Sequence, residues 1–264
     1  MRRSYLVGIL VFIGMKMLTS EQISILSSLV NDCLDEAEAT WGSVGELIRA
    51  FASVTESALI PTEIPGYPFI QNGKPKVDDF VCLILDMRDS TNHLMCHISE
   101  KTADVSMLKR VYFETSALLP ATAKVISYGK GSVTEYLGDG VLALFRVDDD
   151  SVISNSYNTA INCLECLHKV INPILYNRYR LPALSVGVGM ARSDAIVTLV
   201  GLKQAPQAKV FGECVFRASK LSKGINEVVV DPRLKNSWPT SKGGRLSFIP
   251  KSIKGENGYI IYKK

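Results

Sequence analysis

The N-terminal part of the chain lacks an apolar run long enough to cross a membrane. Arg2 and Arg3 precede an apolar run over residues 6–15, whereas a spanning helix needs about 20 apolar residues. Basic residues followed by an apolar run also begin secretory signals, but no small-residue cleavage site of the usual form follows. We interpret residues 1–18 as an N-terminal extension, upstream of a start at Met15 or Met17 or forming a short buried element, and expect no membrane partner.

The chain also lacks the cysteine pattern of a disulfide framework. Its six cysteines are scattered, several within apolar runs, which is typical of reduced core residues in a cytoplasmic protein. Cys163 and Cys166 form a CxxC followed by His168, but there is no second CxxC, and a structural zinc site needs four ligands. His93 and His97, four residues apart on an expected helix, provide only two nitrogen ligands. We interpret both groups as helix packing or surface residues.

A strong excess of charge and any internal repeat are missing as well. The 264 residues are 47% apolar and 21% charged, which excludes disordered and fibrous classes and suits one large core with additional helix. The formal net charge is +4 and the sequence pI about 8.6. This mild excess favours an anionic small molecule and falls short of the pI above about 9 that is typical of nucleic-acid-binding domains. We therefore expect no nucleic-acid partner.

Three regions follow the N-terminal extension. Apolar residues recur at helical spacing over residues 19–59, which predicts a helical segment. Prolines and glycines fill residues 60–77, where we expect a linker without regular structure. The catalytic domain is then expected over residues 78–264.

Within that domain, hydrophobic patterns and turn residues predict the order of the elements. We expect a strand at 80–86, helices at 90–99 and 102–119, a strand at 123–128, a hairpin of strands 133–137 and 141–145, a helix at 154–177, strands at 183–190 and 195–201, a helix at 213–223, and short strands at 228–230, 246–249 and 259–262. This order predicts an α+β fold with a ferredoxin-like core and a C-terminal extension.

Two aspartates carry the clearest chemical signal. Asp86 ends the apolar run 81–85, and Asp139 lies in the Gly138-Asp139-Gly140 turn of the expected hairpin. Carboxylates at the ends of rigid strands can share hard divalent cations such as Mg²⁺ or Mn²⁺. The pair therefore predicts two-metal phosphoryl chemistry on a nucleotide.

At four places the sequence resembles the successive motifs of class III nucleotide cyclases, the adenylate and guanylate cyclase catalytic domains. The motifs lie in the family's order within residues 79–230, at 86–91, 137–140, 186–189 with Gly201, and 211–221. The last of them departs from the purine enzymes in a way that resembles the pyrimidine cyclases of bacterial Pycsar antiphage defence. A ferredoxin-like cyclase core is what this resemblance implies.

The resemblance implies roles for several residues. Asp86 and Asp139, with the backbone carbonyl of Met87, would hold two Mg²⁺ or Mn²⁺ ions, and the ribose 3′ hydroxyl of a nucleoside triphosphate would attack its α-phosphorus. The β and γ phosphates would be bound by backbone amides at the start of a helix. These amides belong to Arg88, Asp89, Ser90 and Thr91.

Two further positions would read the base. The residue four before the second aspartate, lysine in adenylate and glutamate in guanylate cyclases, is Glu135, and the second reading position holds Lys209. A carboxylate acceptor with an ammonium donor fits cytosine or guanine better than uracil. CTP is therefore slightly ahead of UTP, and GTP stays open. A plain ion pair between the two side chains is the alternative.

The family's transition-state asparagine and arginine correspond to Phe216 and Lys220. Lysine keeps one positive charge without the two-pronged guanidinium of arginine, and Arg217 or Arg192 could supply the missing guanidinium. Either the pocket is rebuilt for a smaller pyrimidine, or the domain is an inactive dimerising or regulatory module. A nucleotidyltransferase with a related two-carboxylate hairpin is a further alternative.

In class III cyclases the substrate lies between two protomers. The resemblance therefore implies a homodimer with its active sites at the interface. In the Pycsar branch the cyclic nucleotide is a second messenger, which implies a cyclic-nucleotide-binding effector as the reader of the product.

Overall fold

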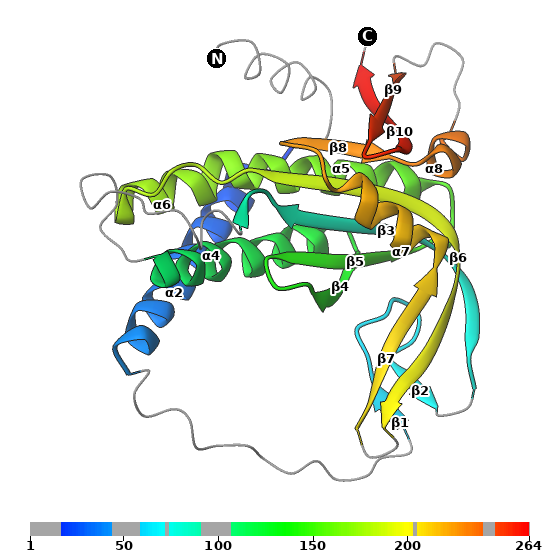
Figure 1. Ribbon diagram of the computed structural model, residues 1–264, viewed down its shortest axis with the longest axis horizontal. Helices are drawn as coiled ribbons and strands as arrows, with labels where there is room; N and C mark the ends of the chain where they lie inside the picture. The colour runs from blue at the N-terminus through cyan, green and yellow to red at the C-terminus, as the bar shows by residue number, and fades with distance from the viewer. Residues whose placement is uncertain are drawn as a thin grey trace.

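The computed structural model describes residues 17–43, 59–71, 74–90, 107–202, 205–239 and 246–263. In these ranges helices pack around one large, twisted sheet (Figure 1). The helices are α2 (Ser20–Ser43), α4 (Met107–Tyr128), α5 (Ser151–Cys166), the π-helical turn η2 (Leu167–Ile171), α6 (Asn172–Tyr179), α7 (Glu213–Leu221) and α8 (Pro232–Asn236). None of these helices is long and apolar enough to cross a membrane.

The sheet has the order of a ferredoxin-like core. Its strands are β3 (Lys76–Met87), β4 (Ser132–Tyr136), β5 (Gly140–Arg146), β6 (Val186–Leu202), β7 (Ala205–Gly212), β8 (Glu227–Val230), β9 (Leu246–Ile253) and β10 (Glu256–Lys263). They follow the order β4-β5-β3-β6-β8-β10-β9, and β7 pairs with β6 outside this path. The antiparallel unit β4-β5-β3-β6, connected as β-α-β-β-α-β, confirms the expected fold class.

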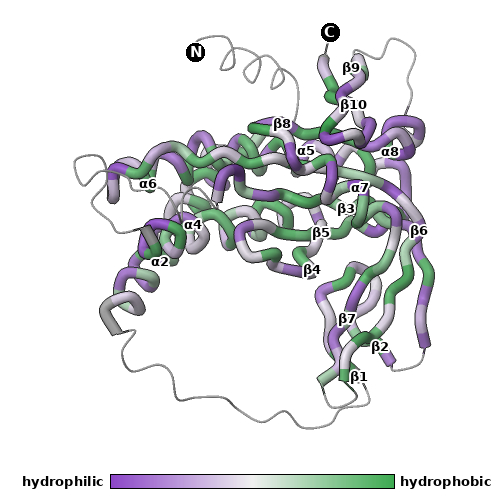
Figure 2. Tube along the Cα trace, viewed as in Figure 1, coloured by the Kyte–Doolittle hydropathy of each residue, from purple (hydrophilic) through white to green (hydrophobic). Residues whose placement is uncertain are grey.

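Strand β3 lies at the centre and contributes to two separate cores. Because side chains alternate along a strand, Val81, Leu83 and Leu85 pack with α2, α4 and α5, whereas Cys82 and Ile84 pack on the face covered by α7. Its neighbour β5 is buried over almost its whole length, and Figure 2 shows it as mostly hydrophobic. The C-terminal end of β3 and the start of β5, which lie side by side, are therefore held in place by buried packing.

Helix α2 belongs to the main core. It starts with a reciprocal cap, in which the Thr19 hydroxyl accepts from the Gln22 amide and the Gln22 side chain accepts from the Thr19 amide. Its apolar face is fully buried against α4 and η2. On the outer side, Arg178 and Tyr179 of α6 both donate to Glu38. The predicted helix over 19–59 is confirmed to residue 43, residues 44–58 lie outside the described ranges, and residue 59 is in a strand.

The predicted strand over 123–128 is wrong, because α4 continues through Tyr128. Buried residues of this segment recur at mixed spacings of three and four, which is the pattern of one helix face and not of a strand. They are Phe113, Ala117, Leu118, Ala121, Val125 and Ile126. Pro120 lies inside this helix without ending it. The apolar, partly β-branched run near the end of the helix has the composition of a strand, and tertiary packing decides otherwise.

Two further expectations are corrected, and two elements were not expected. Residues 60–77 do contain regular structure, because β1 (Leu59–Pro61) pairs with β2 (Phe69–Gln71) in a small hairpin and β3 begins at residue 76. The strands expected at 183–190 and 195–201 form the single strand β6, because its pairing with β3 runs without a break from Val186 to Val197. Arg192, between the two expected strands, contacts Asp79 of β3 at 2.6 Å. Strand β7 and helix α8 were not expected.

The helix expected at 90–99 lies outside the described residues from residue 91 on, and the helix expected at 102–119 is described from residue 107 as the start of α4. The remaining expected elements agree with the structure. The helix over 154–177 is confirmed as the consecutive α5, η2 and α6, and the hairpin, α7, β8, β9 and β10 lie where predicted. Cys163 and Cys166 are buried among core side chains, as helix packing predicts. Residues 1–16 and the histidines at 93 and 97 lie outside the described residues.

Candidate active site

Asp86 and Asp139 lie next to each other at the same edge of the sheet. In the β3–β5 ladder Asp86 is directly opposite Gly140, and the Met87 amide approaches the Asp139 carbonyl at 3.4 Å. The turn is closed by the Leu137 amide, which donates to the Gly140 carbonyl at 2.8 Å. Gly138 has a φ of +80°, a conformation that favours glycine. The Gly-Asp-Gly spacing therefore fixes one aspartate beside the other.

Both carboxylates face one open pocket of about 360 Å³. Its lining consists of Asp86, Met87, Arg88, Asp89, Ser90, Asp139 and Lys223. Five of the six predicted metal and phosphate positions at 86–91 thus line the pocket with Asp139, as the motif spacing predicts. The sixth, Thr91, lies outside the described residues. Sequence reasoning did not single out Lys223.

Positive side chains contact the strand-end carboxylate. Asp86 forms ion pairs with Arg88 and with Lys223, whose Nζ lies 2.8 Å from Oδ2. Burial lowers the pKa of Lys223, and Arg88 lowers it further, whereas Asp139 opposes the shift. Burial likewise lowers the pKa of Arg88, and Asp139 and Asp89 oppose it. The pocket therefore concentrates charge of both signs in a partly desolvated space.

The donor set suits hard divalent cations. In the described part of the chain no cluster of three or more His, Cys, Asp or Glu side chains forms a complete metal cage. Mg²⁺ typically binds through one or two carboxylates and takes its other ligands from water and substrate phosphates. Asp86 and Asp139, with backbone carbonyl oxygens nearby, fit that mode of binding.

The two predicted base-reading residues contact each other. Lys209 of β7 donates to Glu135 of β4 with Nζ 2.6 Å from Oε2, and the side chains are 28% and 25% exposed. Neither residue lines the pocket described above. Their backbone positions on different strands are fixed by the β4–β5 and β6–β7 ladders.

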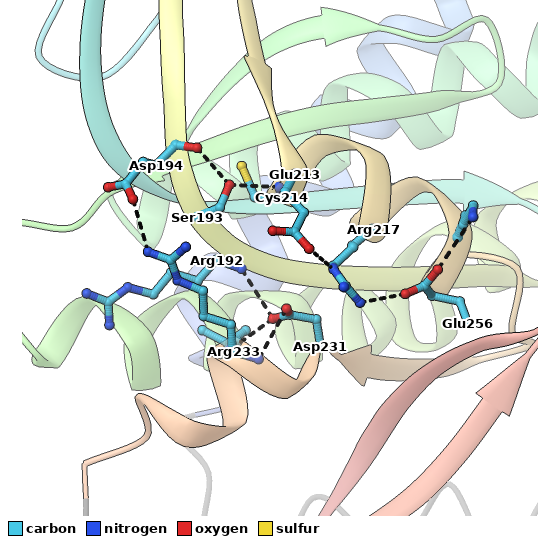
Figure 3. A network of polar contacts seen from close by, with 11 residues as sticks. Arg192, Ser193, Asp194, Glu213, Cys214, Arg217, Asp231, Arg233 and Glu256 are labelled. Atoms are coloured by element: carbon cyan, nitrogen blue, oxygen red, sulfur yellow. Dashed lines mark hydrogen bonds and ion pairs between the residues drawn. The ribbon is translucent and has the colours of Figure 1, made fainter.

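Helix α7 presents the three remaining predicted residues. Phe216 is 60% exposed, and the Lys220 ammonium lies over its ring, 4.3 Å from the centroid. Arg217 donates to Glu213 and to Glu256 of β10, each at 2.6 Å (Figure 3). The hydrogen bond to Glu213 is the main cause that raises the pKa of Arg217.

Glu256 is a second residue that sequence reasoning missed. It lies 3.5 Å from Lys220 as well as 2.6 Å from Arg217, and its side chain is 15% exposed. Because it comes from β10, far along the chain, no motif spacing could have indicated it. Arg192 is held by Asp79 and lies outside the pocket lining.

The glycines of the 186–189 motif allow α7 to approach β6. A Cβ at Gly187 would collide with the carbonyl oxygens of Ser222 and Gly224, and one at Gly189 would collide with the carbonyl oxygen of Ala218. The backbone at the end of α7 therefore rests directly on β6. This contact fixes the turn that carries Lys223.

Comparisons with known proteins agree with this architecture. No family model matches the chain. An adenylate cyclase from Anabaena cylindrica is 24% identical over 244 residues, which cover 89% of this chain but only 46% of that protein. The chain thus spans about half the length of this relative.

Several solved structures are similar in fold. The guanylyl cyclase Cya2 matches with a TM-score of 0.56 at 16% identity, over 73% of this chain and 93% of that one. The adenylyl cyclase CyaB from P. aeruginosa matches with a TM-score of 0.55 at 13% identity, over 72% and 96%. A non-canonical dimeric guanylyl cyclase domain of the RhoGC fusion protein from Blastocladiella emersonii matches with a TM-score of 0.53 at 14% identity, over 72% of this chain and 98% of that one. The chain therefore has the fold of a class III nucleotide cyclase catalytic domain, which confirms the resemblance seen in its motifs.

Proposed function

We propose that this protein is a nucleotide cyclase that converts a pyrimidine nucleoside triphosphate, CTP ahead of UTP, into a 3′,5′-cyclic mononucleotide and pyrophosphate. The observation that carries the proposal is the convergence of Asp86 and Asp139, on adjacent strands, at one pocket. The fold shared with adenylyl and guanylyl cyclases supports it.

The reaction needs little covalent chemistry from the protein. Asp86, Asp139 and the Met87 carbonyl would hold two Mg²⁺ or Mn²⁺ ions, which when bound neutralise the triphosphate and lower the pKa of the ribose 3′ hydroxyl. That hydroxyl gives up its proton to solvent, and its oxygen forms a bond to the α-phosphorus while the bond from this phosphorus to the oxygen that bridges to the β-phosphate breaks, so that pyrophosphate leaves. Asp89 and Ser90 line the same pocket, where their backbone amides can orient the phosphates. The Arg88 amide, expected to share this role, donates instead to the Ser185 carbonyl at 2.8 Å.

Base selection would use the Glu135–Lys209 pair. A carboxylate accepts from the exocyclic amine of cytosine, and an ammonium donates to a base carbonyl. The two side chains already lie in contact, so a base must separate them or bind both at once. Glu135 alone also suits guanine, which makes a guanylate cyclase the first alternative.

A composite site in a homodimer accounts for where the remaining residues lie. Glu135, Lys209, Phe216, Arg217 and Lys220 are absent from the lining of the pocket in a single chain. In a homodimer they would come from the partner subunit, and each of two equivalent sites would combine both sets. The matching domain of RhoGC has been solved as a non-canonical dimer, so a domain of this fold can pair with itself.

The second alternative is a catalytically inactive cyclase-like module. Phe216 stands where the family has asparagine, and Lys220 is paired with Glu256. In the active enzyme we assign transition-state charge stabilisation to Lys220, which stands at the position of the family's arginine, and to Arg217, three residues before it on the same helix.

A cyclic pyrimidine nucleotide would act as a second messenger. In the proposed setting the enzyme works in the cytoplasm during bacterial antiphage defence, and a cyclic-nucleotide-binding effector reads the product. A neighbouring gene that encodes such an effector would support this part of the proposal.

The test is incubation of the purified protein with each of the four NTPs and Mn²⁺, with products identified by mass spectrometry. We expect cyclic CMP or cyclic UMP, and loss of product in Asp86→Asn and Asp139→Asn. Asp148→Asn, which removes an equal charge from a side chain 67% exposed, should keep activity. Cyclic GMP would establish the first alternative, and no product from any NTP would establish the second.

A further inference from the structure

Lys223 occupies a special place in the pocket. It is the one lining residue that comes from the turn after α7 rather than from the β3 end or the β4–β5 turn. Its ammonium contacts Asp86 at 2.8 Å, and its side chain is 36% exposed. Its amide hydrogen bonds back to the Lys220 carbonyl at 3.4 Å, so the turn continues the helix backbone.

The backbone of this turn is fixed, although the side chain is not. The flanking Ser222 and Gly224 pack so closely on β6 that only glycine fits at position 187. The Ser222 amide also donates to the Ala218 carbonyl at 2.9 Å. A lysine on a fixed backbone, with four flexible side-chain carbons, can exchange one anionic partner for another within the same pocket.

We propose that Lys223 exchanges partners during substrate binding, pairing with Asp86 in the free enzyme and with the triphosphate of the nucleotide when a divalent cation takes Asp86. The inference rests on the proposed function, and it adds a phosphate-binding residue from the chain that also supplies the carboxylates. Lysine suits this role because its ammonium is a compact point charge, as in other phosphate sites.

The balance of charge in the pocket supports the exchange. Three carboxylates, those of Asp86, Asp89 and Asp139, face the cations of Arg88 and Lys223 in the lining. A divalent cation that binds Asp86 weakens the pairing of that carboxylate with the ammonium, because the two positive charges compete for one carboxylate and repel each other. The displaced ammonium stays in a pocket that then holds a highly anionic triphosphate, where it neutralises phosphate oxygens.

The first arm of the test measures Mn²⁺ binding without nucleotide, by the loss of the free-Mn²⁺ electron paramagnetic resonance signal. Lys223→Met removes the competing ammonium, so it should bind Mn²⁺ roughly threefold more tightly, the size expected for a partly exposed ion pair. Lys223→Arg should resemble the wild type. The matched control is Lys235→Met, which removes the same charge from α8, where the ammonium lies over the Tyr259 ring.

The second arm measures binding of a non-reactive α,β-methylene analogue of CTP at saturating Mn²⁺. Lys223→Met should weaken it about tenfold, as expected for loss of one charge-assisted hydrogen bond, whereas Lys223→Arg and Lys235→Met should not. Unchanged affinity of Lys223→Met for Mn²⁺ or for the analogue overturns the inference, provided that thermal unfolding shows the variant to be folded. Neither arm requires turnover. The binding measurements therefore test the inference about Lys223, and the product assay separately tests the proposed reaction.

Discussion

The Glu135–Lys209 pair offers a test that separates base reading from simple structural pairing. The double variant Glu135→Lys with Lys209→Asp reverses the ion pair and places at position 135 the lysine that adenylate cyclases have there. We expect it to fold like the wild type and to shift product formation from cytosine or uracil nucleotides towards ATP. The single reversals should be less stable, because each places two like charges in contact.

The size of the stability effect follows from the contact. The side chains are 2.6 Å apart and less than a third exposed, so the pair lies at the upper end of the range for surface ion pairs, about 1 kcal/mol. A single reversal adds repulsion of similar size, for a total of about 2 kcal/mol. In a domain of this size, each kcal/mol lowers Tm by about 2–4 °C. The double variant should recover most of the loss.

Two assays read the result, thermal unfolding and the product profile with all four NTPs and Mn²⁺. Recovery of Tm shows that the reversed pair has formed, which makes the double variant a fair test of recognition. If Tm recovers and the nucleotide preference does not move, the pair is structural only and our assignment of base reading is refuted.

Three further predictions address α7 and the assembly. Glu256→Gln should lower kcat with little change in KM, because it weakens the contacts that hold Arg217 and Lys220. The Tm should stay within about 2 °C, because the change removes no core side chain. Steady-state kinetics checks this prediction, with Lys220→Arg as the comparison variant. Mixing Asp86→Asn and Lys220→Ala protomers, each inactive alone, should restore up to one working site per heterodimer, and failure of complementation would mean that each chain is self-sufficient. Gly187→Ala should cost about 2–4 kcal/mol in denaturant unfolding, because backbone atoms must move; a cost below about 1 kcal/mol would contradict the close packing of α7 on β6.

Local patterns in the sequence predict much of the site. The apolar run before Asp86 and the Gly-Asp-Gly turn around Asp139 each indicate a strand end, and together they predict the pair that lines the pocket. The start of α7 is also predictable, because Gly212 precedes a segment with a helical pattern. These features depend on a few neighbouring residues and their backbone preferences.

Other features depend on contacts between segments that are far apart in the chain. The local spacing of apolar residues does not predict these contacts. The contact of Lys223 with Asp86 joins residues far apart in the chain, as does that of Glu256 with Arg217. The end of α4 is misread for the same reason, since β-branched residues such as Val125 favour a strand locally and are buried as part of a helix.

The shared pair of cations is the central claim, and diffraction tests it most directly. Crystals grown with Mn²⁺ and the non-reactive CTP analogue would locate manganese by its anomalous signal. The account predicts two manganese ions, each bound by carboxylate oxygens of Asp86 and Asp139 and by phosphate oxygens of the analogue. Manganese bound elsewhere, or contacting only one of these carboxylates while the nucleotide is in place, would contradict it.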